Sequence, residues 1–146
     1  MGKVKSMEQV AKDIFQRGKR EHFEDGMESR FSCSLTEFIL ENGDAGVHIV
    51  GGLIYSGSVN VGVGEEALRW IGHMEHPETY SSRIFWSERC LFSAHPRIRD
   101  AAGLALASMD NTTAIPALKR AIGYESHTIL KSDLQQVLDQ LEGGKK

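Results

Sequence analysis

The sequence predicts an all-α fold, a right-handed α-solenoid of seven to eight helices packed as successive αα-hairpins. Apolar residues recur at three- and four-residue intervals through most of the 146 residues, which is the spacing of one helical face. Part of the pattern also repeats after 35 residues, between positions 61–75 and 96–110. Because one hairpin cannot bury its apolar face alone, repeated hairpins are expected to stack.

The clearest hairpin runs from residue 95 to residue 122. Pro96 suits a helix start, because its missing N–H would be unpaired in the first turn anyway. Apolar residues then follow on one face: Ile98, Ala101, Ala102, Ala105, Leu106 and Met109. Leu104 and Ala107 make the opposite side apolar too, so we expect this helix to be covered on two sides. After a polar break with capping residues, a second helix has an apolar face of Ile115, Leu118 and Ile122.

This hairpin reads Pro-x-Ile-Arg-x-Ala-Ala-x-x-Ala-Leu-Ala-x-Met-Asp, followed by Ala-Ile-Pro-Ala-Leu. It resembles a HEAT repeat of the short bacterial kind, also seen in phycobilin-lyase-type repeats. The match covers about 28 residues, from His95 to Ile122, and fades on either side. The resemblance implies stacked helix pairs that act mostly as protein-binding surfaces, and it implies no catalytic residue.

The first part of the chain predicts two capping helices, within about residues 6–41. The helix over residues 6–20 has an apolar face of Met7, Val10, Ala11, Ile14 and Phe15. The next helix has an apolar stripe of Met27, Phe31, Leu35, Phe38 and Ile39. It ends at Asn42-Gly43, a good C-terminal signal. Such helices close a stack by burying one face and showing a polar one to water.

Residues 43–64 allow two interpretations, because they hold seven of the fifteen glycines together with many β-favouring residues. One is a β-hairpin with its turn near Ser56-Gly57-Ser58. The other is a helix from about Ala45 to Tyr55 and a new helix starting near Val61. Each interior glycine costs a helix ~1 kcal/mol relative to alanine. We favour the helices, because helices flank the segment and an isolated hairpin is only marginally stable.

The rest of the chain predicts repeat-like units at about residues 60–94 and 95–124 and a capping helix at about 127–142, all within a single domain of residues 1–146. At the offset of 35, Ala67, Ile71 and Met74 align with Ala102, Leu106 and Met109. A longer helix is expected over residues 77–94, with Phe85 and Phe92 available for burial. The apolar seam of the last helix is Ile129 or Leu130, Leu134, Val137 or Leu138, and Leu141.

Composition favours a soluble cytoplasmic protein. No apolar run approaches the ~20 residues of a membrane span, and no apolar segment follows the N-terminal lysines as in a signal peptide. Cys33 and Cys90 lack a metal-ligand pattern and are expected to be buried, reduced thiols. The net charge of −3 makes nucleic acid an unlikely partner, although residues 1–20 hold six Lys or Arg and two acids.

No set of residues predicts catalysis, a cofactor or a metal site. His73, His76 and His95 have ligand-like types and spacing, but His76 and His95 each precede a proline at a turn, which explains their placement. The acids near His22, which are Glu21, Glu24, Asp25 and Glu28, suit the start of a helix. Glu65, Glu66 and Asp100 could act in acid–base chemistry and are interpreted instead as exposed helix residues.

The predicted function is therefore non-catalytic binding of a protein partner, which the sequence does not identify. Arg and Trp are enriched in interface hot spots, so the candidate interaction surface is Arg83, Trp86, Arg97 and Arg99. Trp70 is expected in the core. Two alternatives stay open: a bilin lyase or its accessory subunit, implied by the resemblance, and a nucleic-acid-binding repeat protein, suggested by the basic first helix with Arg97 and Arg99.

Overall fold

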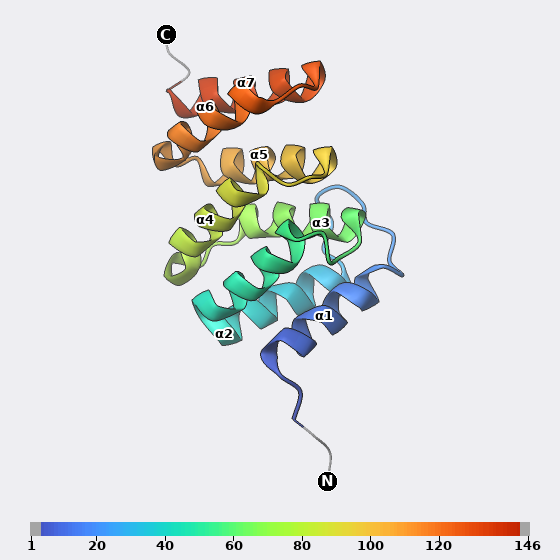
Figure 1. The fold of residues 1–146 in the computed structure, drawn as a ribbon. Coiled ribbons are helices and arrows are strands. Elements are labelled where there is room, and N and C mark those ends of the chain that lie inside the picture. The colour runs from blue at the N-terminus through green and yellow to red at the C-terminus, as the bar shows by residue number, and fades with distance from the viewer. Residues whose placement is uncertain (1–3, 144–146) are drawn as a thin grey trace.

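The computed structural model describes residues 4–143, and within that range the chain is all-helical, without a strand (Figure 1). The elements are α1 (Met7–Gly18), α2 (Arg30–Tyr55), α3 (Val61–His73), the 3₁₀ turn η1 (Pro77–Thr79), α4 (Tyr80–Cys90), α5 (Pro96–Met109), the 3₁₀ turn η2 (Thr112–Ala114), α6 (Ile115–Tyr124) and α7 (Thr128–Leu141). The prediction of an all-α protein is confirmed.

The helices follow one another along the long axis of the molecule (Figure 1). Helices α1 and α2 lie at one end, and α6 and α7 lie at the other. Most of the starts are encoded locally: Ser6, Ser29 and Asn60 each accept a hydrogen bond from a first-turn N–H of α1, α2 and α3. His95 does the same for α5, by accepting from Arg97 N at 3.2 Å.

Helices α3 and α5 run in the same direction and approach closely. Gly64 faces Ile98, and Gly72 faces Ala105 further along both helices. A Cβ on Gly72 would lie 2.8 Å from the Ala105 Cα, so only glycine allows the two helix backbones to approach this closely. The repeat positions Ala67 and Ala102 are both fully buried. The glycine that weakens α3 locally therefore permits its packing.

Two other pairs of packed helices are also parallel. Between α5 and α7, Gly103 faces Leu134, and Gln140 Nε2 donates to Ala107 O at 2.9 Å. Between α2 and α4, Ser82 Oγ donates to Asp44 Oδ1 at 2.7 Å, and Gly51 faces Trp86. In each pair, later residues of one helix meet later residues of the other.

The segment over residues 43–64 is helical, so the β-hairpin alternative is wrong. Gly43 has φ 62° and ψ −143°, a conformation that favours glycine, and it kinks α2 into two helical stretches. The second stretch continues to Tyr55, and α3 begins at Val61 after a short turn. A Cβ on Gly51 would lie 2.2 Å from the Trp86 ring. Here too, glycine serves the packing of a neighbouring helix.

Several burial predictions for apolar residues are wrong. Leu104 is 59% exposed, so α5 is not covered on its second side. Phe85 and Phe92 are also exposed; Phe85 lies within α4, and Phe92 lies beyond its end because the predicted long helix is the turn η1 followed by the shorter α4. Met27 is exposed because it precedes the start of α2 at Arg30. In α7 the seam uses Leu130, Leu134, Val137, Leu138 and Leu141, while Ile129 faces water.

The two cysteines differ. Cys90 is buried, and its burial raises the pKa of the thiol to about 12, which makes it inert at neutral pH. Cys33 is exposed on the first stretch of α2, so the prediction of two buried thiols is wrong for this residue. No helix within residues 4–143 has both the length and the hydropathy to cross a lipid bilayer.

Candidate functional site: a groove along α3 and α5

A groove of about 790 Å³ lies along α3 and α5, closed at its edges by the α1–α2 linker and by α7. Its apolar lining consists of Phe23, Ala101, Leu104, Ala105 and Ala107. Leu104 lines it with more than half of its surface exposed. The second apolar side of α5, which the sequence predicted to be covered, is therefore an open surface.

One flank of the groove carries an ion pair between neighbouring helices. Arg97, at the start of α5, donates from Nε to Glu65 Oε2 of α3 at 3.0 Å, and its Nη2 donates to Glu65 Oε1. This two-point contact raises the pKa of Arg97, chiefly through the hydrogen bonds to Glu65. The Arg97 side chain is 59% exposed, so water screens the pair and the pair adds little to stability.

A second group of charges ties the linker to α3. Arg69 Nη2 donates to Asp25 Oδ1 of the linker at 3.1 Å, and Arg69 Nε lies 3.6 Å from Glu66 Oε1. Glu66 is buried, and its Oε2 accepts the indole N–H of Trp70 at 2.8 Å. Trp70 is half-buried, so its interpretation as a core residue holds only in part. These contacts fix Arg69 at the edge of the groove.

The third feature is a pair of acids that joins α5 to α7. Asp100, which lines the groove on α5, has Asp133 of α7 as a neighbour. Burial raises the pKa of Asp100, and the hydrogen bond to Asp133 and the charges of Asp133 and Glu65 raise it further. Carboxylates outnumber guanidinium groups in the lining, where Asp25, Glu65, Glu66 and Asp100 stand against Arg69 and Arg97, and Asp133 adds a further acid beside Asp100. The groove is thus acidic on balance.

No family model, curated protein or solved structure matches the chain. The assignment of a site therefore rests on the residues themselves.

Four residues were predicted to form an interaction surface. Arg83 cannot belong to it, because only 1% of its surface is exposed. Its guanidinium donates to three carbonyls at and after the end of α3: Ile71 O at 2.8 Å, Met74 O at 3.1 Å and His76 O at 2.8 Å. Nε donates to Thr79 Oγ1 at 2.9 Å. Burial lowers the pKa of Arg83. Arg83 is a structural cation that caps the negative end of α3.

Arg99 also serves the fold. It donates from Nε and Nη2 to the two Glu125 oxygens at 2.8 and 3.0 Å, and from Nη1 to Ser93 O at 3.0 Å. The hydrogen bonds from Arg99 lower the pKa of Glu125. Both side chains are largely buried, so this pair fastens the start of α5 to the α6–α7 turn.

Trp86 lies on α4, away from the contacts of the groove. Its Nε1 donates to His48 Nδ1 at 2.8 Å, and its ring packs edge-to-face against Phe85 with centroids 5.3 Å apart. Arg89 stacks over Tyr55 beside them, at 5.2 Å from the ring centre. Of the four predicted residues, only Arg97 lines the groove.

The histidines raised as possible metal ligands have other partners. His76 Nδ1 shares a hydrogen bond of 2.9 Å with Thr79 Oγ1, and His95 caps α5. Within residues 4–143, no group of three or more His, Cys, Asp or Glu side chains is arranged to hold a metal ion. In the acidic linker, Glu21 accepts from Arg30 N at 3.1 Å, which fits its expected place at a helix start.

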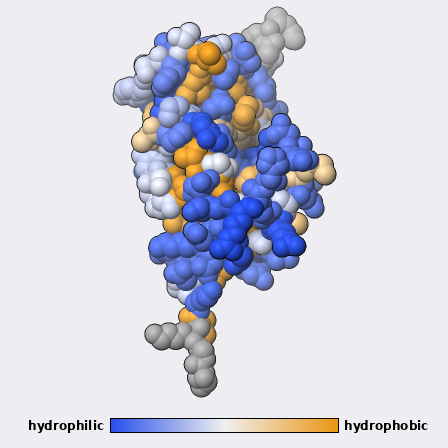
Figure 2. All heavy atoms as spheres, turned by 90° about the vertical axis from the view of Figure 1, so that its right-hand side faces the viewer, coloured by the Kyte–Doolittle hydropathy of each residue, from blue (hydrophilic) through white to orange (hydrophobic). Residues whose placement is uncertain are grey.

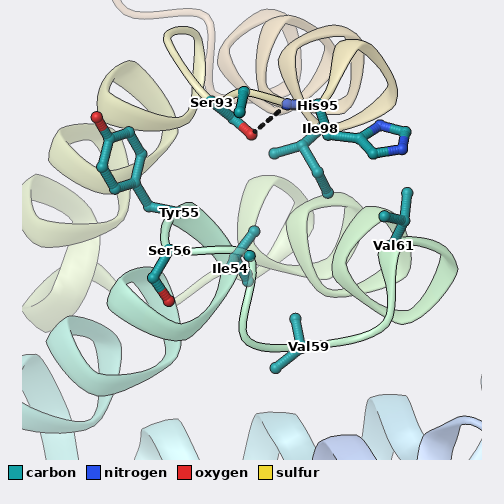
Figure 3. Close-up of a pocket in the computed structure, with 10 residues that line it drawn as sticks. Ile54, Tyr55, Ser56, Val59, Val61, Ser93, His95 and Ile98 are labelled. Atoms are coloured by element: carbon teal, nitrogen blue, oxygen red, sulfur yellow. Dashed lines mark hydrogen bonds between the residues drawn. The ribbon is translucent and has the colours of Figure 1, made fainter.

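A second, smaller cavity of about 260 Å³ lies between the α2–α3 turn and the α4–α5 turn (Figure 3). Ile54, Val59, Val61 and Ile98 face it, whereas the Tyr55 ring points away. The hydrogen bond from His95 N to Ser93 Oγ, 3.1 Å long, stays within one turn. This cavity offers hydrocarbon and little polar chemistry, whereas the groove along α3 and α5 offers both.

Sequence reasoning missed two features of the site. Leu104 was expected to be covered and instead lines the groove, and no pattern in the sequence indicated that Asp133 lies beside Asp100. The available signal was the excess of apolar residues on α5, which one packing face does not explain. The structure does bring together Glu65, Glu66 and Asp100, the three acids that the sequence singled out.

Proposed function

We propose that the chain is a short HEAT-type α-solenoid that binds a protein partner, without catalysis, through the groove along α3 and α5. The hairpins α3–α4 and α5–α6 would be its two repeat-like units. Their first helices run in the same direction in close contact, with Gly72 against Ala105. Parallel packing of equivalent helices is what a stack of repeated hairpins requires.

The observation that carries the proposal is the exposed Leu104 on the apolar floor of a groove with charged flanks. Large apolar side chains that gather in an exposed hollow mark interaction sites, and an apolar centre with a polar rim is the usual anatomy of an interface. Figure 2 shows hydrophobic patches in the upper half of one face, toward the C-terminal end, and mainly hydrophilic side chains below.

The flanks suit binding better than acid–base chemistry. Glu65 and Glu66 are held by Arg97 and Arg69, so their carboxylate oxygens already have partners within the fold. The acidic balance of the groove also disfavours nucleic acid, because phosphates need basic contacts.

The test places a photo-crosslinking amino acid at position 104 and, as a control, at the exposed Arg120 of α6. We expect a discrete adduct in native lysate from position 104 only. Excess unlabelled wild-type protein should abolish the adduct, whereas excess Leu104→Glu should not. Equal labelling from both positions, or equal competition by the two proteins, would contradict the proposal.

A further inference from the structure

We propose that the segment bound in the groove is basic, with a Lys or Arg side chain seated against Asp100 and Asp133 and an apolar neighbour covering Leu104. This inference rests on the proposed function and names the chemistry of the partner. Three features of the groove support it: its acidic balance, the distribution of its ion pairs, and the place of Leu104 beside the acids.

The acids of the groove differ in whether a cation already accompanies them. Glu65 is paired with Arg97, and Asp25 and Glu66 are paired with Arg69. Within residues 4–143, neither Asp100 nor Asp133 forms an ion pair with a Lys, Arg or His side chain. Asp100 and Asp133, between α5 and α7, are therefore acids at the groove that have no cationic partner among the described side chains.

Two carboxyl groups in hydrogen-bonding reach of each other need one shared proton or a cation. The groups that face Asp100 are Asp133 on α7 and Glu65 on α3, and both favour its protonated form. A guanidinium or ammonium group placed between Asp100 and Asp133 would instead favour the charged form of Asp100. Electrostatic complementarity of this kind selects basic partners and rejects acidic ones.

The surroundings favour a peptide over a bare ion. Leu104 follows Asp100 by one helical turn on α5, so both side chains lie on the same face of that helix. The groove volume of about 790 Å³ lies within the range of roughly 300–1,000 Å³ that ligand pockets span. A segment that alternates basic and apolar residues would meet both the acids and Leu104.

The test uses two fluorescein-labelled peptides and fluorescence anisotropy in about 50 mM salt, where screening is weak. One peptide is Leu-Lys-Ala-Lys-Leu-Arg-Ala-Lys, and the other has Glu at every basic position. We expect the basic peptide to bind and the acidic one not to bind. The double variant Asp100→Asn with Asp133→Asn should weaken binding at least about tenfold, because the receiving charges are gone.

The matched control is Glu37→Gln with Asp139→Asn, which changes the net charge equally at exposed positions outside the groove. This control should bind like the wild type. Equal weakening in both double variants would overturn the inference, because it would indicate nonspecific attraction. Equal binding of both peptides, or of neither, would also overturn it. Circular dichroism verifies folding, and the single variant Asp133→Asn replaces the double variant should the latter not fold.

Sedimentation of the peptide-free protein separates a second copy from a partner protein. Oligomers that dissociate in the Asp100→Asn, Asp133→Asn variant would place another copy of the chain in the groove and overturn the inference. The experiments also distinguish a failure of this inference from a failure of the proposed function. A specific adduct at position 104 that persists unchanged in the double variant would leave the groove as a binding site and exclude the basic anchor.

Discussion

At the residue scale, Arg83 shows how one side chain holds a turn together. Its charge is buried without a carboxylate and is balanced by three carbonyls. Arg83→Met would leave those acceptors buried without donors, so we expect a loss of about 2–4 kcal/mol in the free energy of unfolding. Urea denaturation followed by circular dichroism measures it.

Arg97 is the matched control for that prediction. It is exposed and paired in water, so Arg97→Met should cost less than about 1 kcal/mol. Equal losses for the two variants would show that the burial of Arg83 has no energetic consequence.

Asp100 should give stability an unusual dependence on pH. Its pKa is raised in the folded protein, so the folded state holds the proton more tightly than the unfolded chain does. Stability from this group is therefore fully present below the ordinary pKa of 3.8 and is lost as the pH rises from there through the raised pKa of the folded state. Asp100→Asn should remove this fall and be more stable than the wild type at pH 7. Thermal melting between about pH 4 and pH 7 checks it.

Glu125 supplies the opposite case in the same titration. Its pKa is lowered by Arg99, so its contribution is present at neutral pH and is lost on acidification. Asp100→Asn keeps Arg99 and Glu125. If this variant no longer loses stability as the pH rises, that loss in the wild type is assigned to Asp100 and Asp133. An unchanged pH profile in Asp100→Asn would contradict the account.

At the element scale, glycines decide how closely the helices pack. Gly72→Ala would bring a methyl group against the backbone of Ala105, at 2.8 Å from its Cα. We expect this variant to push α3 and α5 apart and to lose about 1–3 kcal/mol of stability, as overpacked cores do. Gly123→Ala is the control, because nothing lies within 4 Å of its added Cβ, and it should gain up to about 1 kcal/mol. Opposite signs are the expected result, and losses in both variants would indicate a general intolerance of alanine.

At the scale of the whole molecule, the sequence predicted those features of the fold that depend on the local residue pattern. Pro96 starts α5, Gly43 interrupts α2, and Ala67 and Ala102, which align at the offset of 35, are both fully buried. These features follow from backbone preference and helical periodicity, which are readable within a few turns of chain.

What could not be predicted depends on which neighbours a face meets. Leu104 is exposed because no helix of the described chain covers that side of α5, and an apolar residue alone does not reveal this. Arg83 is buried because carbonyls from the end of α3 converge on it. Asp100 and Asp133 are neighbours because α7 packs beside α5. The pattern of a single sequence does not show which helices pack together.

The most direct test of the account is a chemical-shift map of the ¹⁵N-labelled protein titrated with the basic peptide. We predict that the largest amide shifts fall on α3, α5 and α7 around Glu65, Asp100, Leu104 and Asp133, with little change around Phe85 and Arg89 on α4. Shifts concentrated on that α4 face, or spread evenly over the surface, would contradict the assignment of the groove as the binding site.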